Sequence, residues 1–196
     1  MTTARDLVLV ALGMPADRPV AQGDLSLALA GAEAIDLLES GALSLDGDRM
    51  VPGTRVATGD ALLEQAEASL IRREPYETVD GWLWRRGSDL AAVYVDGVER
   101  AGLVAHPRGQ GFRLRFGRTV PADSQARRSA EEREPVLAAL LAAVGVGEVP
   151  SEARENLIGD AVTTVLAAVR DAVTRLEALR LRRDIENAAF DNVWRG

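Results

Sequence analysis

The chain contains no cysteine, no lysine and only one histidine, His106, among its 196 residues. Without cysteine it can form no disulfide, thiolate nucleophile or Cys-rich zinc site, and we expect a reducing, cytoplasmic location. A single histidine beside Pro107 cannot complete a metal site or a nucleophile–base pair by itself. We therefore expect no metal centre and no cofactor.

Long apolar runs and catalytic motifs are also missing. The apolar segment Leu7–Leu12 is too short to span a bilayer, and no basic stretch precedes it. There is no Walker loop and no GxGxxG between a strand and a helix. The carboxylates of Asp46 and Asp48, and those within 131–134, occur in turn and helix-start settings that favour acids for structural reasons. Binding is therefore predicted rather than catalysis.

The charge is unevenly distributed along an acidic chain. All 23 basic residues are arginine, and the net charge is −7. Residues 1–70 carry 4 Arg against 11 acids, whereas residues 104–128 carry 6 Arg against one Asp. The helix and hairpin expected over 25–52 resemble a winged-helix DNA reader, but they lie in the acidic part, where such a reader needs a basic face. We expect no nucleic-acid partner.

Apolar residues recur mainly at helical spacing, which predicts a mainly α fold. With 47% hydrophobic residues and no visible linker, the chain is expected to form one compact helical domain over residues 1–196. The side chains of 58–60 are predicted to cap a helix that includes Leu62, and Asp89 to cap another. The expected helices cover 6–12, 25–38, the segment starting near 62, 77–86, 90–99, 129–144 and 152–192.

Two β-hairpins are expected between these helices. The turn Asp46-Gly47-Asp48, with alternating residues on both sides, predicts a small hairpin near 42–52. A glycine-rich loop at 107–111 predicts a second, projecting hairpin near 103–118. Because side chains alternate across a strand, this hairpin should place Phe112, Leu114 and Phe116 on one face and Arg113 and Arg115 on the other.

A second cluster of interest combines tryptophan with arginine. Trp84, Arg85 and Arg86 follow Trp82 in the helix expected over 77–86. Indole and guanidinium groups together suit a membrane interface or an anionic head group. The alternative interpretation is structural, with Trp82 in the core and Trp84 partly exposed.

Several stretches, in order and spacing over about residues 5–120, resemble the Golgi phosphoprotein 3 (GPP-type) family, whose bacterial members occur in actinobacteria. Each motif is short, and the resemblance depends on their succession along the chain. They are Asp6–Leu12, Leu29–Leu37 continuing through Gly41–Leu45, Thr58–Glu64, Glu77–Val79 with Trp82, and Val98–Val104 before the second hairpin.

The resemblance implies a mostly helical fold with a projecting hairpin, peripheral attachment to membranes through phosphatidylinositol phosphate head groups, adaptor activity without catalysis, and self-association through the hairpin. The family's head-group pocket positions fall here at Ala21, Ala30, Gly87 and Leu90, so the lipid contacts are expected from other residues. These are Trp84, Arg85 and Arg86, and the hairpin arginines Arg108, Arg113, Arg115 and Arg118.

Two hypotheses follow. In the first, the protein is a peripheral adaptor that binds anionic phospholipid on the inner face of a membrane and has a protein partner of unknown identity. In the second, it is a cytosolic scaffold of the same fold that has lost head-group recognition and self-associates through the hairpin and the long C-terminal helices. The apolar hairpin face of Phe112, Leu114 and Phe116 would insert into the membrane, form an oligomer contact, or pack on the protein body.

Overall fold

The computed structural model describes residues 2–14, 20–103, 135–147 and 159–193, with side chains up to residue 188. The chain is mainly helical with one small antiparallel hairpin, which confirms the expected fold class and the hairpin near 42–52. The hairpin expected near 103–118 lies outside the described residues from 104 onward. The elements are α1 (Thr3–Leu12), α2 (Gln22–Glu39), β1 (Leu43–Asp46), β2 (Arg49–Pro52), α3 (Ala61–Ala68), α4 (Val79–Arg86), α5 (Leu90–Arg100), a helix over 135–143, and α8 (Asp160–Val193).

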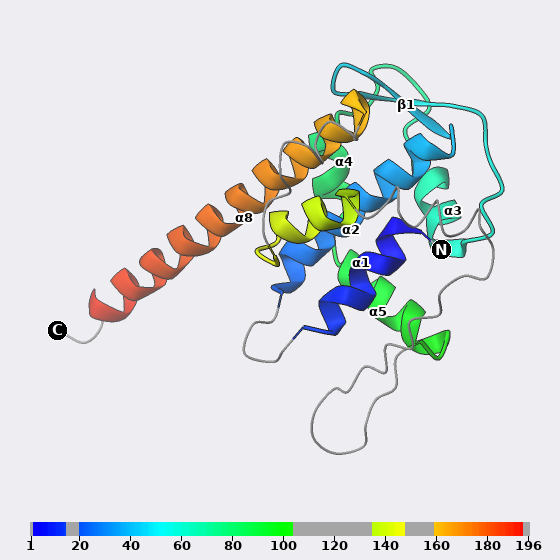
Figure 1. The fold of residues 1–196 in the computed structure, drawn as a ribbon. Coiled ribbons are helices and arrows are strands. Elements are labelled where there is room, and N and C mark those ends of the chain that lie inside the picture. Colours follow the sequence, from blue (N-terminus) through cyan, green and yellow to red (C-terminus); the bar gives the residue numbers. More distant parts are fainter. Residues whose placement is uncertain (1, 15–19, 104–134, 148–158, 194–196) are drawn as a thin grey trace.

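Helix α2 is the centre of the molecule. Every residue from Leu25 to Leu37 is buried, and α2 packs against α1, α4, α5 and α8, as Figure 1 shows. A helix that is covered on all sides needs small residues where its neighbours approach closely. Gly31 is such a residue, because a Cβ atom there would overlap with Val169 of α8.

Side chains of α2 also cap two other helices. The Asp36 carboxylate accepts hydrogen bonds from the backbone N–H groups of Thr3 and Ala4, at 2.9 and 3.2 Å, at the start of α1. The Ser26 hydroxyl accepts one from the N–H of Ala91, at 3.0 Å, at the start of α5. Asp89 occupies the N-cap position of α5, as predicted, but its backbone adopts a left-handed conformation with φ of 56° and its side chain makes no capping bond.

Helices α3 and α4 begin with local caps, and the one at α3 was predicted from the sequence. The Asp60 carboxylate accepts bonds from the N–H groups of Leu62 and Leu63. The Thr78 hydroxyl accepts a bond from Gly81 at 3.0 Å, so α4 begins at Val79, two residues after the expected start. Satisfying these otherwise unpaired N–H groups fixes where each helix begins.

The small hairpin holds the start of α4 in place. Its strands pair in the register Leu43↔Pro52 to Asp46↔Arg49, around a two-residue turn with Gly47 at a φ of 60°. Beside β2, the chain at 77–79 forms two backbone bonds, from Met50 N–H to Glu77 O and from Val79 N–H to Asp48 O, both 2.9 Å. The loop 53–60, which follows β2, and the loop 70–76, which precedes residue 77, therefore lie side by side.

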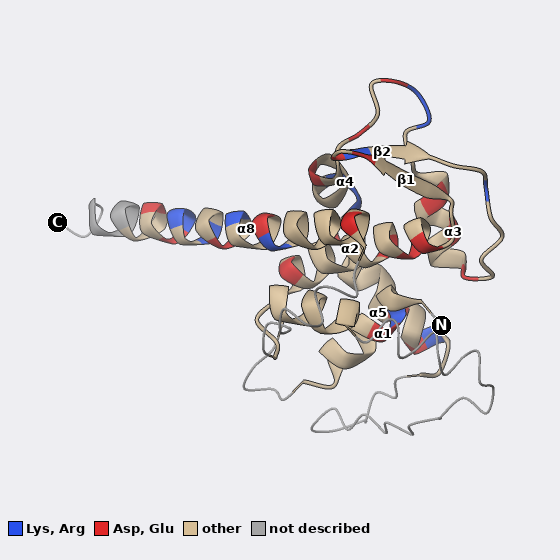
Figure 2. Cartoon of the chain, turned by 45° about the horizontal axis from the view of Figure 1, so that its top comes forward, with Lys and Arg blue, Asp and Glu red and all other residues tan. Residues whose placement is uncertain are grey.

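Helix α8 has a packed half and a projecting half. Val165, Val169 and Ala172 are fully buried against the body, whereas every residue from 181 to 188 is exposed. Figure 1 shows the outer half extending away from the other helices, and Figure 2 shows that it carries both acidic and arginine residues. Among the described residues, none of the helices combines the length and apolarity required to cross a bilayer.

Candidate functional site

Helix α4 carries the tryptophan–arginine cluster. Trp82 is fully buried, and its indole N–H donates a 2.9 Å hydrogen bond to the backbone oxygen of Ala30 in α2. Trp84 is partly exposed, with the Arg175 guanidinium of α8 at 5.7 Å from the ring centroid. Arg175 also pairs with Asp80, one turn before Trp84. Trp82 therefore lies in the core and Trp84 is partly exposed, which is the structural alternative considered for this cluster.

Arg86 is bound inside the protein. Its Nε and Nη2 donate to the two carboxylate oxygens of Glu33, at 2.8 and 2.9 Å, and the Tyr94 hydroxyl donates to the same carboxylate at 3.0 Å. Glu33 is fully buried, and the Arg86 side chain is only 17% exposed. This arginine compensates a buried carboxylate of α2, so its charge is used within the fold.

Burial governs the titration of this cluster. Desolvation raises the pKa of Glu33 above its ordinary 4.5, although the hydrogen bonds and charge of Arg86 act in the opposite direction. Burial, together with the neighbouring Glu33 charge, also raises the pKa of Tyr94. Tyr94 therefore stays protonated and donates its hydrogen to Glu33.

Arg85 has an internal partner as well, but lies closer to the surface. Its Nε and Nη2 donate to Glu77, at 2.7 and 2.6 Å, and Nη2 also donates to the backbone oxygen of Ser69. The hydrogen bond that Arg85 donates to Glu77 raises the pKa of Arg85. Its side chain is 41% exposed and stacks over the Trp82 ring at 5.4 Å. Of the three predicted residues on α4, Trp84 and Arg85 are thus partly accessible from solvent.

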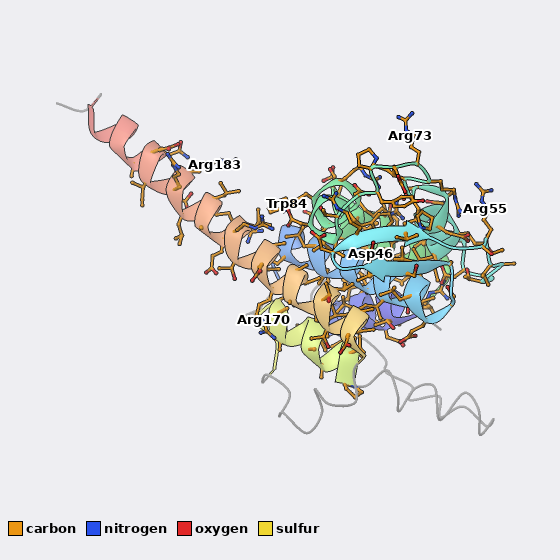
Figure 3. The ribbon with its side chains drawn as sticks, turned by 90° about the horizontal axis from the view of Figure 1, so that it is seen from above. Asp46, Arg55, Arg73, Trp84, Arg170 and Arg183 are labelled. Atoms are coloured by element: carbon orange, nitrogen blue, oxygen red, sulfur yellow. The ribbon has the colours of Figure 1, made fainter. Side chains whose placement is uncertain are left out.

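The structure reveals a basic and apolar surface that the sequence does not indicate. The Arg72 guanidinium donates a 2.9 Å bond to the backbone oxygen of Gly53, which joins the loops 53–60 and 70–76. Figure 3 shows Arg55 and Arg73 pointing away from the body into solvent. We call the following five exposed residues the two-loop surface: Arg55, Val56, Ile71, Arg72 and Arg73.

Acidic groups near this surface are partly neutralised. Glu67, which is buried, lies 3.4 Å from Arg72, while Glu74 is exposed next to Arg73. At the end of loop 53–60, Asp60 pairs with Arg5 at 3.4 Å and Glu64 accepts a bond from the Gly59 N–H, so the positive charge of this surface is local to Arg55 and Arg73. Isolated arginines in separate loops form no sequence pattern, and the bond between Arg72 and Gly53 shows that the two loops are in contact.

A groove between α4 and α8 is the other surface feature of this region. It has a volume of about 440 Å³ and is lined by Asp80, Ala168, Asp171, Thr174 and Arg175. Its central arginine is engaged by Asp80 and Trp84. Within the described part of the chain, no cluster of three or more His, Cys, Asp or Glu residues could hold a metal ion.

The remaining predicted site residues belong to the second hairpin and lie outside the described residues. They are Arg108, Phe112, Arg113, Leu114, Arg115, Phe116 and Arg118.

Comparison with known proteins gives one match. Neither the curated proteins nor the solved structures contain a match to this chain. The model of one family, Golgi phosphoprotein 3 (GPP34), matches residues 4–192, which is nearly the whole sequence. The succession of motifs between residues 5 and 120 and the mainly helical fold agree with that match. The chain belongs to the Golgi phosphoprotein 3 (GPP34) family.

Proposed function

We propose that this protein is a peripheral membrane adaptor that binds the surface of anionic phospholipids and catalyses no reaction. Membership of the Golgi phosphoprotein 3 family supports an adaptor fold. The observation that carries the lipid proposal is the two-loop surface, where Arg55 and Arg73 extend into solvent beside exposed Val56 and Ile71. Basic groups next to apolar ones suit the boundary between head groups and acyl chains.

The strength of such binding can be bounded. Each arginine near an anionic surface contributes about 1 kcal/mol, so Arg55 and Arg73 together contribute about 2 kcal/mol. Adding the hairpin residues Arg108, Arg113, Arg115 and Arg118 at the same membrane gives about 6 kcal/mol, a Kd of roughly 40 µM. The proposal therefore needs both the two-loop surface and the second hairpin at the membrane. Their apolar side chains would add to the electrostatic part of the binding free energy.

Co-sedimentation with neutral and anionic phospholipid vesicles, at low and high salt, tests this function. We expect binding to the anionic vesicles only, and weaker binding at high salt because mobile ions screen the attraction. The variants Arg55→Glu/Arg73→Glu and Arg113→Glu/Arg115→Glu should each weaken binding by about 30-fold or more.

A matched control separates a site from a general charge effect. Arg170 and Arg183 are exposed on α8, and Arg170→Glu/Arg183→Glu changes the net charge by the same amount as each test pair. This control should bind as the wild type does. Equal binding to neutral and anionic vesicles would refute the lipid function. Equal losses of vesicle binding in the control and in the Arg55/Arg73 variant would show that the two-loop surface is not the binding site.

A further inference from the structure

Three arginines fix the backbone around the two-loop surface. Each donates a hydrogen bond from its guanidinium to a backbone oxygen, and the pairs are Arg49 with Tyr76 at 2.9 Å, Arg72 with Gly53 at 2.9 Å, and Arg85 with Ser69 at 3.2 Å. Arg49 and Arg85 act at the two ends of the loop 70–76, because Tyr76 is its last residue and Ser69 directly precedes it. Arg72 lies inside this loop but bonds to the first residue of the loop 53–60. Arg72 therefore joins one loop to the other.

The Arg72 guanidinium serves two acceptors from two elements. Its Nη1 donates to the backbone oxygen of Gly53, and its Nη2 lies 3.4 Å from Oε1 of Glu67. Glu67 belongs to α3, and its side chain is only 7% exposed, so it holds the guanidinium at a fixed place. The planar fork of arginine can reach two acceptors at once, whereas the ammonium group of lysine is a compact point charge. This position therefore depends on the shape of the side chain as well as on its charge.

The backbone that Arg72 contacts is itself closely packed. The Gly53 N–H donates a 2.8 Å hydrogen bond to the backbone oxygen of Ala42, just before β1. A Cβ atom at Gly53 would lie 2.5 Å from the backbone oxygen of Gly41, so the two chain segments approach as closely as glycine allows. Gly53 is therefore a firm anchor for the bond that Arg72 donates.

The two solvent-directed arginines lie next to this anchor. Arg55 comes two residues after Gly53, and Arg73 directly follows Arg72. Within the part of the chain that the structure describes, the side chains of Arg55 and Arg73 form no ion pair or hydrogen bond, and Figure 3 shows both pointing into solvent. The bond between the loops therefore sets where these two available charges lie relative to each other.

We propose that Arg72 is a positioning residue for lipid binding, an inference that rests on the proposed function. Its bond to Gly53 keeps the two loops together, so that the solvent-directed arginines and exposed aliphatic side chains of both loops meet an anionic membrane as one surface. Loops that are already held in place need no ordering at the membrane, which would otherwise weaken binding. Arg72 acts through this geometry and not by placing its own charge among the head groups.

A charge-preserving substitution separates these two roles. Arg72→Lys keeps the positive charge but cannot serve both acceptors, so its affinity for anionic vesicles should fall about fivefold, which is the contribution of one arginine at such a surface. Arg72→Gln, which also removes the charge, should fall to the same level. Arg170→Lys, the same exchange at an exposed position of α8, is the matched control and should bind as the wild type does.

Hydrogen exchange in the absence of lipid measures the state of the loops directly. In Arg72→Lys and Arg72→Gln, the backbone amides of 53–60 and 70–76 should exchange faster than in the wild type. The amides of α2 should exchange at the wild-type rate, because Arg72 is exposed and the core does not depend on it. Unchanged exchange in α2 also shows that both variants are folded.

A cross-link can restore the geometry without the arginine, because the chain contains no cysteine of its own. Thr54→Cys/Arg72→Cys should bind anionic vesicles as weakly as Arg72→Gln does. Joining the two thiols with a short bis-maleimide should return vesicle binding to near the wild-type level. Treatment of the same variant with a monofunctional maleimide is the control and should leave binding weak.

Three results would overturn the inference: Arg72→Lys that binds as tightly as the wild type, weakened binding with unchanged exchange in both loops, or a cross-linked protein that still binds weakly. Failure of the proposed function looks different, because the wild type itself then does not bind anionic vesicles. In that case the exchange measurement, which uses no lipid, still decides whether Arg72 holds the two loops together.

Discussion

The arginines of α4 and those of the two-loop surface illustrate opposite uses of the same side chain. Arg86 is bound to a buried carboxylate and hydrogen-bonded at two nitrogens, whereas Arg55 and Arg73 extend into solvent. Arg85 is intermediate, with a two-point bond to Glu77 at a partly exposed position. The comparison teaches that an arginine's availability for a ligand depends on which acids the fold brings to it, and adjacent positions in the sequence can differ completely.

The largest effect on folding is expected from breaking the buried pair. Arg86→Ala leaves the Glu33 carboxylate buried and uncompensated, so the free energy of unfolding should fall by about 3–5 kcal/mol. Urea unfolding monitored by circular dichroism measures it. The double variant Glu33→Gln/Arg86→Met should recover much of this loss, because it removes both charges together. A loss below about 1 kcal/mol in Arg86→Ala would show that the carboxylate reaches water.

The next effect concerns the dependence of stability on pH. Because burial raises the pKa of Glu33, the folded protein binds this proton more tightly than the unfolded chain. The contribution of Glu33 to stability is then fully present below about 4.5 and is lost as the pH rises through the folded pKa.

Urea unfolding of the wild type and of Glu33→Gln across a pH series tests this sign. The unfolding free energy of the wild type relative to that of Glu33→Gln should fall as the pH rises through that window. Above the window the difference should become constant. A change in the opposite direction would mean that Arg86 outweighs desolvation and lowers the pKa.

The smallest effects are expected at the exposed arginines, and they sharpen the comparison. Arg85→Ala should cost at most about 1 kcal/mol, because its pair with Glu77 is screened by solvent. Arg73→Ala should change the unfolding free energy by less than about 0.5 kcal/mol. The same urea titrations measure both variants. A loss at Arg73 that equals the loss at Arg86 would contradict the division into structural and surface arginines.

Local signals in the sequence predicted most of the described elements. The Asp-Gly turn predicted the first hairpin, Asp60 predicted the start of α3, and the apolar periodicity predicted the central helix. Each of these signals depends on residues that are only a few positions apart. The succession of short motifs also pointed to the correct family. Helix starts that depend on another helix were less predictable, as Ser26 capping α5 in place of Asp89 shows.

The chemistry of the site was harder to predict, because its contacts join distant positions. Glu33 and Arg86 are 53 residues apart, and no spacing rule relates them. The two-loop surface likewise depends on a bond between Arg72 and Gly53, which belong to different loops. The hairpin arginines from 108 to 118 lie outside the described residues, so their role stays a prediction.

The contact between α2 and α8 has a consequence for synthesis of the chain. α2 is complete by residue 39, but the valines and alanine that cover it through α8 lie between residues 165 and 172. At about 5–20 residues per second, a ribosome needs roughly 7 to 30 s to make the intervening chain. During that interval α2, which is buried on all sides in the folded protein, lacks one side of its cover. The nascent chain should therefore depend on chaperones that hold apolar helices until translation is nearly finished.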